Sequence, residues 1–227
     1  MYKRQRLGNL DRALSHLDRA IEENPLLPEV QLARGELLLV AGAPTPATAA
    51  LEAASNLLHE DAQLEARLGQ ALLATGRHEE ALTHLRSAVT GGFSPDDLER
   101  ALALALTLNG LLSESERVLS QAGIADNLDS EVIRGLIMLE RDAFAAAEEI
   151  LRPVATNRAN EPAILNLFAS VLYRQGRYEE AVAILESAEE IDRSAEPIVA
   201  NLAVARAARA AELLAQNAAA VKAAPTK

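Results

Sequence analysis

The decapeptide GRHEEALTHL spans residues 76–85, and GRYEEAVAIL repeats it almost unchanged at residues 176–185. The alanine of "EEA" is Ala81 in the first copy and Ala181 in the second. Small residues recur in the same phase along the chain, at Ala13, Ala47, Ala81, Ser115, Ala147 and Ala181. The successive steps are 34, 34, 34, 32 and 34 residues. Periods of this length indicate stacked structural repeats.

Three further columns keep the same phase. A leucine follows each small residue by four positions, at Leu17, Leu51, Leu85, Leu119, Leu151 and Leu185. A turn residue precedes it by five, at Gly8, Gly42, Gly76, Gly110, Asp142 and Gly176. Seven residues before five of these turns stand Gly35, Gly69, Ala103, Gly135 and Ala169. A helical glycine costs about 0.5–1 kcal/mol relative to alanine, so this pattern predicts two helices per unit that approach closely at the small residues.

This pattern resembles the tetratricopeptide repeat (TPR) over roughly residues 1–194. The resemblance implies an all-α fold, a right-handed superhelical α-solenoid of antiparallel helix pairs with about twelve helices. Composition favours the same fold class, because alanine and leucine dominate and only 3% of residues are aromatic. The family's tryptophan position is never tryptophan here, and only Pro25 closes a unit in the family's manner.

The expected layout is a repeat array over residues 1–195 that begins in mid-repeat, a capping helix over 196–215 and a flexible tail over 216–227. The first expected helix, 9–24, is the second of a pair, and only seven residues precede Gly8. We therefore expect the natural protein to be longer, the alternative being that Tyr2 and Leu7 form a remnant of the missing helix.

The remaining helices are expected over 28–41, 46–57, 62–74, 78–90, 96–109, 113–122, 129–140, 143–155, 162–175 and 178–191. Residues 43–46 and 91–95 are predicted to be turns, with Ser94 as an N-cap. The unit over 128–161 is the least regular, since Asp142 replaces the turn glycine and Pro153 falls inside a helix. We expect Pro153 to kink or end that helix, and the short step to change the curvature near residues 122–130.

Charge and composition limit the function. Acidic residues outnumber basic ones 33 to 22, giving a net charge of −11, whereas a nucleic-acid-binding protein needs clustered cations. The basic start MYKRQRL lacks the apolar core of a secretion signal, and the sequence has no cysteine and no apolar run long enough for a membrane span. The compartment stays open between cytoplasm and periplasm, and the alanine richness suggests a bacterial source.

Catalysis and cofactor binding find little support in the sequence. The four histidines are His16, His59, His78 and His84. Two of them, His78 and His84, are six residues apart on one expected helix, which is the wrong spacing for a ligand pair one turn apart. The acidic pair of each decapeptide is expected to stabilise a helix N-terminus. We expect neither enzymatic activity nor a bound cofactor or metal.

The resemblance implies that the first helices of successive pairs line a groove for a peptide or helix of a partner protein. By register, the groove residues are Leu32, Glu36, Leu39, Ala66, Gln70, Leu73, Arg100, Leu104, Leu108, Val132, Leu136, Leu139, Asn166, Ser170, Tyr173 and Arg174. This set is mostly apolar, which suits a partner with aliphatic anchors. The alternative is that several of the leucines belong to the core.

Some TPR proteins grip the C-terminal carboxylate of a chaperone with lysines and asparagines. The equivalent positions here hold Leu32, Glu36, Arg67, Asp97 and Ala101, so that partner class is not expected.

The leading hypothesis is a non-catalytic scaffold or adaptor that binds a partner protein. The alternatives are a chaperone-like carrier in bacterial secretion or pilus assembly, and the regulatory region of a larger enzyme. Self-association through the apolar stripe of the first helix is a further possibility.

Overall fold

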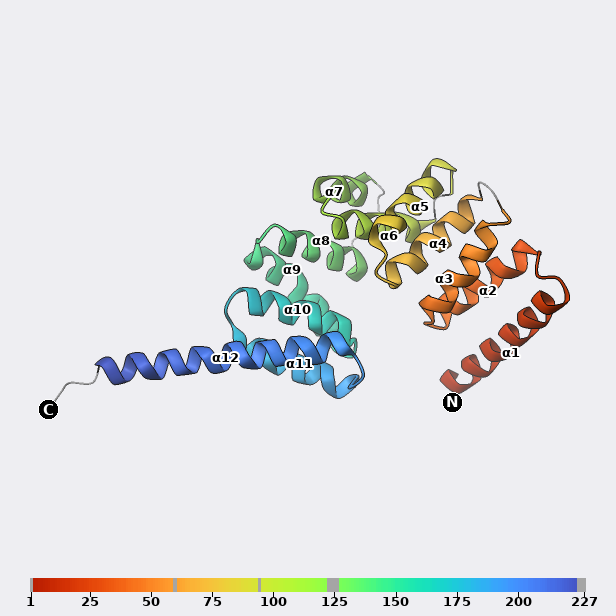
Figure 1. Ribbon diagram of the computed structural model, residues 1–227. Coiled ribbons are helices and arrows are strands. Elements are labelled where there is room, and N and C mark those ends of the chain that lie inside the picture. The colour runs from red at the N-terminus through yellow and green to blue at the C-terminus, as the bar shows by residue number, and fades with distance from the viewer. Residues whose placement is uncertain (1, 59–60, 94, 122–126, 224–227) are drawn as a thin grey trace. The chain divides into compact units, whose positions relative to one another are not determined.

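The computed structural model describes residues 2–58, 61–93, 95–121 and 127–223, and these ranges form twelve α-helices and no strand (Figure 1). The chain divides into two compact units, residues 1–125 and 126–227. Unit 1 contains α1 (Tyr2–Glu23), α2 (Pro28–Val40), α3 (Pro44–Ser55), α4 (Ala62–Ala74), α5 (His78–Thr90), α6 (Asp96–Leu108) and α7 (Leu112–Gln121). Unit 2 contains α8 (Leu128–Glu140), α9 (Phe144–Asn157), α10 (Pro162–Arg174), α11 (Tyr178–Ile191) and α12 (Glu196–Ala223).

Consecutive helices pack as antiparallel hairpins, which confirms the helical-repeat solenoid expected from the sequence. The pairs are α2 with α3, α4 with α5, α6 with α7, α8 with α9, and α10 with α11. The expected close approach is present inside the hairpins. A Cβ added to Gly69 would lie 2.6 Å from Cγ of Leu85, and one added to Gly35 would lie 2.5 Å from Cγ of Leu51. The leucines of the second helices therefore pack directly on the glycines of the first helices.

The turn between the two helices of a hairpin requires a left-handed backbone. Gly76 has φ +79° and Gly176 has φ +78°, a conformation that glycine adopts without steric cost. Asp142, which replaces glycine in the irregular unit, adopts φ 57°. Aspartate is one of the few other residues that tolerate this region. The turn column read from the sequence is thus confirmed at these positions.

Both decapeptides build the same ion pair. Arg77 donates from Nε to Oε1 of Glu80 at 2.7 Å and from Nη2 to Oε2 at 2.6 Å. Arg177 makes the same two hydrogen bonds to Glu180, at the same distances. Each arginine also reaches the second helix of the preceding hairpin, with 2.6 Å from Arg77 Nη1 to Glu52 Oε1 in unit 1. The acidic pair therefore does more than stabilise a helix N-terminus, because it ties neighbouring repeats together.

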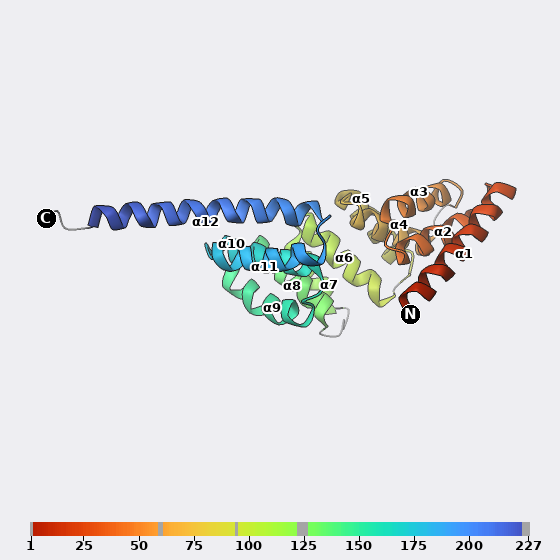
Figure 2. The same ribbon diagram turned by 90° about the horizontal axis from the view of Figure 1, so that it is seen from below.

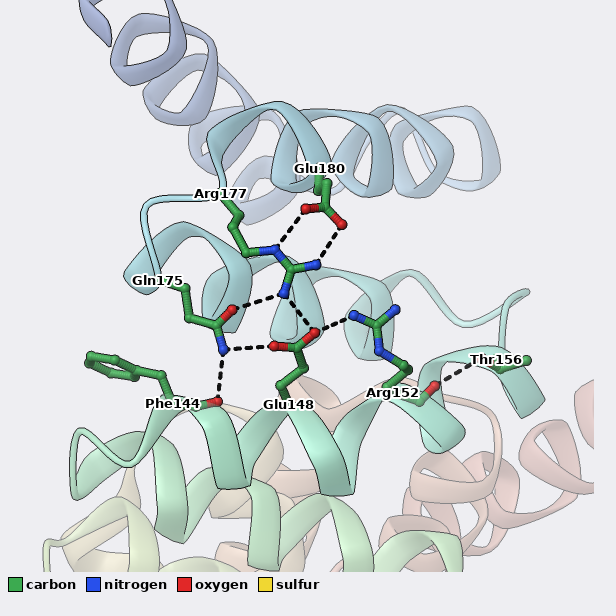
Figure 3. Close-up of polar contacts among 7 residues, drawn as sticks. All are labelled: Phe144, Glu148, Arg152, Thr156, Gln175, Arg177 and Glu180. Carbon is green, nitrogen blue, oxygen red and sulfur yellow. Dashed lines mark hydrogen bonds and ion pairs between the residues drawn. The ribbon is translucent and has the colours of Figure 1, made fainter.

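In unit 2 the partner of Arg177 on the preceding hairpin is Glu148, with 2.6 Å from Nη1 to Oε1 (Figure 3). Arg152 and Gln175 also donate to this carboxylate (Figure 3). The hydrogen bonds from Arg177, Arg152 and Gln175 lower the pKa of Glu148 to about 2. Glu148 is therefore ionised throughout the physiological pH range.

A side-chain amide joins neighbouring repeats at the residue before two of the turn glycines. Asn109 donates from Nδ2 to the carbonyl of His78 at 3.0 Å, and Gln175 donates from Nε2 to the carbonyl of Phe144 at 3.1 Å. Both acceptors are the first residue of the second helix in the preceding hairpin. Because the first carbonyls of a helix face away from its N-terminus, each amide gives such a carbonyl an additional partner.

The two units have separate hydrophobic cores. The core of unit 1 is built around Leu51, Leu72 and Leu106, and that of unit 2 around Leu172 and Leu202. The boundary at residues 125 and 126 falls within the predicted array of residues 1–195, next to its short repeat step. The expected Ser94 cap lies outside the described residues, and so do residues 122–126, where part of the expected change in curvature falls.

The start of the chain differs from the expectation. The structure has one continuous helix from Tyr2 to Glu23, so Gly8 lies inside α1 and not in a turn. A separate helix of fewer than seven residues would have to nucleate by itself, whereas extending α1 adds one hydrogen bond for each residue fixed. The apolar stripe of α1 contacts α2, and Leu14 packs against the core of unit 1 while remaining partly exposed.

Prolines account for two further corrections. α3 begins at Pro44, so residues 44–46 form its first turn, where the missing N–H of proline costs nothing. α9 does not end at Pro153 but continues to Asn157. The buried side chains of Val154 and Ala155 hold this last turn against the core of unit 2, which offsets the hydrogen bond lost at proline.

The last helix is longer than expected. α12 begins at Glu196, as predicted, but extends to Ala223 instead of ending near residue 215. Ile198, Leu202 and Ala205 are buried against α10 and α11, and residues 210–216 are all exposed. The helix therefore covers the end of the repeat stack with its first half and then continues past α10 and α11 (Figures 1 and 2).

Candidate functional site

The first helices of successive hairpins lie beside one another within each unit. In unit 1, α2 contacts α4 and α4 contacts α6, and in unit 2, α10 contacts α12. We call the surface of α2, α4 and α6, and likewise that of α8, α10 and α12, the first-helix face of its unit. α12 follows α11 in the position of another first helix, so the capping helix is also part of this face.

The sixteen residues expected in the groove all lie on first helices, but they differ in accessibility. Ala66 is fully buried and belongs to the core of unit 1. Leu108 and Arg174 are exposed, and the other thirteen are partly buried. Leu39 and Leu73 pack against the core of unit 1, and part of each side chain is still accessible.

Unit 2 has an apolar pocket on its first-helix face, with a volume of about 220 Å³. Its lining comes from α8, α10, α11 and α12. The lining residues are Leu139, Ala169, Ser170, Tyr173, Arg174, Leu185, Asn201, Val204 and Ala205. Leu185, from the second decapeptide, is buried at its floor, while Val204 on α12 is 53% exposed at its edge. Four of the expected groove residues therefore meet here.

Polar groups surround the apolar pocket. Asn201 donates from Nδ2 to Oδ1 of Asn166 at 2.8 Å, linking α12 to α10. Among the described residues no other hydrogen bond engages the Asn201 oxygen or the Asn166 amino group. Both groups can therefore bond to other partners, since each amide carries two donors and an acceptor. The guanidinium of Arg174 lies 4.8 Å from the ring centre of Phe144 and pairs with Asp142, so its charge is already balanced.

The first-helix face of unit 1 has a different character. Arg67 on α4 donates from Nε to Oε1 of Glu36 on α2 at 3.1 Å, and from Nη1 to Oδ2 of Asp97 on α6 at 3.1 Å. Gln70 donates to the same Asp97 oxygen at 2.9 Å, and Gln63 donates to Glu36 at 2.9 Å. We call these five residues the polar ladder; they connect all three first helices of the unit.

The ladder carries a net negative charge, because two carboxylates flank one guanidinium. Burial raises the pKa of Asp97, but the hydrogen bond from Gln70 and the charge of Arg67 outweigh it, so that the pKa lies below its ordinary value. Both ladder carboxylates contact Arg67 directly. Asp97 is therefore ionised at neutral pH.

A shallow pocket of about 400 Å³ opens beside the ladder. It is lined by Glu36, Leu39, Val40, Arg67 and Gln70. The two apolar residues come from the last turn of α2, and Val40 is 64% exposed. This pocket combines an aliphatic wall with a carboxylate, unlike the apolar pocket of unit 2.

Sequence reasoning missed two parts of these surfaces. The contribution of α12 was not expected, although Asn201 follows Asn166 by 35 residues and so falls nearly in the repeat phase. Arg67 and Asp97 were considered only as positions of a carboxylate clamp. In the structure, Arg67 pairs with both Glu36 and Asp97.

The histidines and acids do not assemble a metal site in the described residues, where no group of three or more potential ligands comes together. Nδ1 of His84 lies 2.7 Å from Oε2 of Glu65 on the neighbouring helix of the same hairpin. This pair links α4 to α5. None of the helices in the described part of the chain has the length and apolar character of a membrane span.

Two segments match family models described as tetratricopeptide repeat, residues 4–56 and residues 163–188. One match lies in each compact unit, and the second includes the whole decapeptide of residues 176–185. No protein of curated function matches the sequence.

Solved structures with a similar fold share little sequence. The thermophilic TPR protein TTC0263 of Thermus thermophilus is 21% identical, with a TM-score of 0.61 over 78% of this chain and 98% of that one. A tetratricopeptide repeat protein from Parabacteroides merdae is 13% identical, with a TM-score of 0.61 over 91% and 89%. A chain of the APC/C hetero-tetramer Cut9-Hcn1 is 13% identical, with a TM-score of 0.66 over 88% of this chain but only 40% of that one.

Proposed function

The chain is a tetratricopeptide-repeat protein, and on that premise we propose that it is a non-catalytic scaffold that holds a segment of a partner protein on its first-helix faces. The chain shares its fold with another TPR protein, and this fold supports a role as an interaction scaffold. The observation that carries the finer proposal is the apolar pocket of unit 2, which lies open on the surface and is bordered by side-chain amides.

The apolar pocket supports recognition of one bulky apolar side chain. Its volume of about 220 Å³ exceeds that of any single aliphatic side chain, and its lining is mainly carbon. Burying a leucine or phenylalanine side chain contributes about 1.5–3 kcal/mol. The free groups of Asn166 and Asn201 can then bond to the main chain of the same segment, because each amide offers both a donor and an acceptor.

One such anchor does not give stable binding. Association costs at least about 4 kcal/mol in lost translational and rotational freedom, which is more than a single buried side chain returns. The partner segment must therefore make further contacts. The partly exposed leucines along the first-helix faces, Leu73 and Leu104 among them, provide apolar surface for those contacts.

The test compares two substitutions on the same helix. Val204 lines the apolar pocket, whereas Val199 is 42% exposed on α12 and does not line it. Peptides selected from a random display library on the intact chain are titrated by calorimetry against wild type, Val204→Asp and Val199→Asp. We expect Val204→Asp to weaken the binding of peptides with an apolar anchor about tenfold, since it places a charge at an apolar contact. Equal binding by both variants contradicts the assignment of this pocket.

A further inference from the structure

We infer that the pocket beside the polar ladder of unit 1 binds a lysine or arginine side chain of the partner segment. This inference rests on the proposed function, because it names the chemistry of one more contact made by the same segment. It concerns a different unit of the molecule from the apolar pocket, and so the two assignments can fail separately.

Charge is the first argument. Arg67 is the single cation of the ladder, and the carboxylates of Glu36 and Asp97 both pair with it. An anion approaching Arg67 would be repelled by these two carboxylates, whereas a cation would be attracted to a ladder with a net charge of one negative. The side chains of Glu36 and Asp97 remain 33% and 45% exposed, so the charge is accessible.

The unused capacity of Glu36 is the second argument. Gln63 and Arg67 both donate to the same oxygen, Oε1. Among the described residues no donor reaches Oε2 of Glu36. A carboxylate has about four acceptor positions on its two oxygens, so Oε2 can accept a charge-assisted hydrogen bond from an ammonium or guanidinium group without breaking the ladder.

The shape and lining of the pocket are the third argument. Glu36 lies at one side, and Leu39 and Val40 supply an aliphatic wall. Lysine and arginine have this same division, an aliphatic stem that packs on apolar surface and a charged head that stays at the water boundary. A purely apolar side chain would leave Glu36 partly desolvated and unpaired, which disfavours binding. An acidic side chain would face direct repulsion.

The experiment uses the full chain and the same random peptide display library. We expect peptides selected on wild type to be enriched in lysine or arginine, and selection on Glu36→Gln to lose that enrichment. Glu79→Gln is the matched control, because Glu79 is exposed on α5, on a second helix of the same unit. Both substitutions remove one negative charge from unit 1, so a change seen only with Glu36→Gln is local and not a general effect of net charge. Thermal unfolding of each variant establishes that it is folded.

Calorimetry then measures the contact itself. A selected lysine peptide is compared with the same peptide carrying norleucine, which keeps the aliphatic stem and removes the charge. Glu36→Gln should weaken the lysine peptide about two- to fivefold, the range of a partly exposed ion pair, and leave the norleucine peptide unchanged. Adding salt should reduce the difference between the two peptides.

Three results overturn the inference: selected peptides without basic enrichment, equal affinity for the lysine and norleucine peptides, or no effect of Glu36→Gln. Selected peptides that depend on Val204 but not on Glu36 leave the proposed function standing and remove only this inference. Selected peptides whose binding depends on Glu36 but not on Val204 support this inference and contradict the assignment of the apolar pocket of unit 2 as a binding site. A library that yields no binding peptide overturns both.

Discussion

The hairpins α4/α5 and α10/α11 carry the two decapeptides and have several packing features in common. Ala81 and Ala181 are fully buried, and each hairpin has the same arginine–glutamate pair at the start of its second helix. Their first-helix faces differ, however, because Gln70 stands in unit 1 where Ser170 stands in unit 2. The packing positions of the repeat are thus fixed by geometry, while the positions facing outward vary with what each unit contacts.

The largest expected effect tests the shared packing. Gly69→Leu should lower the free energy of unfolding of unit 1 by about 1–3 kcal/mol, because even a Cβ there would lie 2.6 Å from Leu85. The chain has three tyrosines, and two of them, Tyr173 and Tyr178, lie in unit 2. The urea midpoint measured by circular dichroism should therefore fall, whereas the urea midpoint measured by tyrosine fluorescence should change little.

The equivalent glycine of unit 2 serves as the matched control. Gly135→Leu meets Leu151 in the same way, so it should shift the tyrosine transition strongly. If both substitutions move both signals equally, the two units unfold as one, and the division into separately stable units is wrong.

A smaller effect is expected at the amides that join neighbouring repeats. Asn109→Ala and Gln175→Ala each remove a bond to a helix carbonyl, a loss of about 1 kcal/mol. Gln175→Ala should cost more, because Gln175 also donates to the charged Glu148, and bonds to charged groups are the stronger ones. Urea midpoints of the two variants provide the comparison, and a larger loss for Asn109→Ala would contradict it.

The smallest expected effect is on how the stability of unit 2 depends on pH in the acidic range. The pKa of Glu148 is lowered to about 2 by its three donors, so its pairs stabilise unit 2 fully above the ordinary carboxylate pKa near 4.5. That contribution falls as the pH drops from about 4.5 towards 2, because the unfolded chain then binds a proton that the folded chain does not. In Glu148→Gln, the tyrosine transition should lose part of its pH dependence in this window. An unchanged pH profile would show that the network contributes nothing to stability.

The comparison also shows how far sequence reasoning reaches. The small-residue and turn columns predicted the helices and their pairing, because steric fit depends only on residue size at a fixed spacing. Gly8 was misread as a turn, since the pattern does not reveal whether a first helix is present to pack against. Pro153 was expected to kink or end its helix, and α9 does not end there, because buried Val154 and Ala155 hold the next turn in place.

The surfaces of the first helices could be predicted less completely than the fold. Register assigned Leu139, Ser170 and Tyr173 to the expected groove, and these three residues line one pocket because residues on neighbouring first helices follow the repeat period. It did not predict that Arg67 would lie between two carboxylates, since those acids come from helices about thirty residues before and after it.

The repeat, the hairpins and the residues buried between them follow directly from the amino-acid sequence, because side-chain size and helical periodicity are local properties. Which outward-facing residues meet depends instead on how the helices pack. The ladder joins α2, α4 and α6, and the apolar pocket needs α12 beside α10. Ion pairs and pockets depend on the rotation and offset of neighbouring helices, and those are set by the packing of the whole unit.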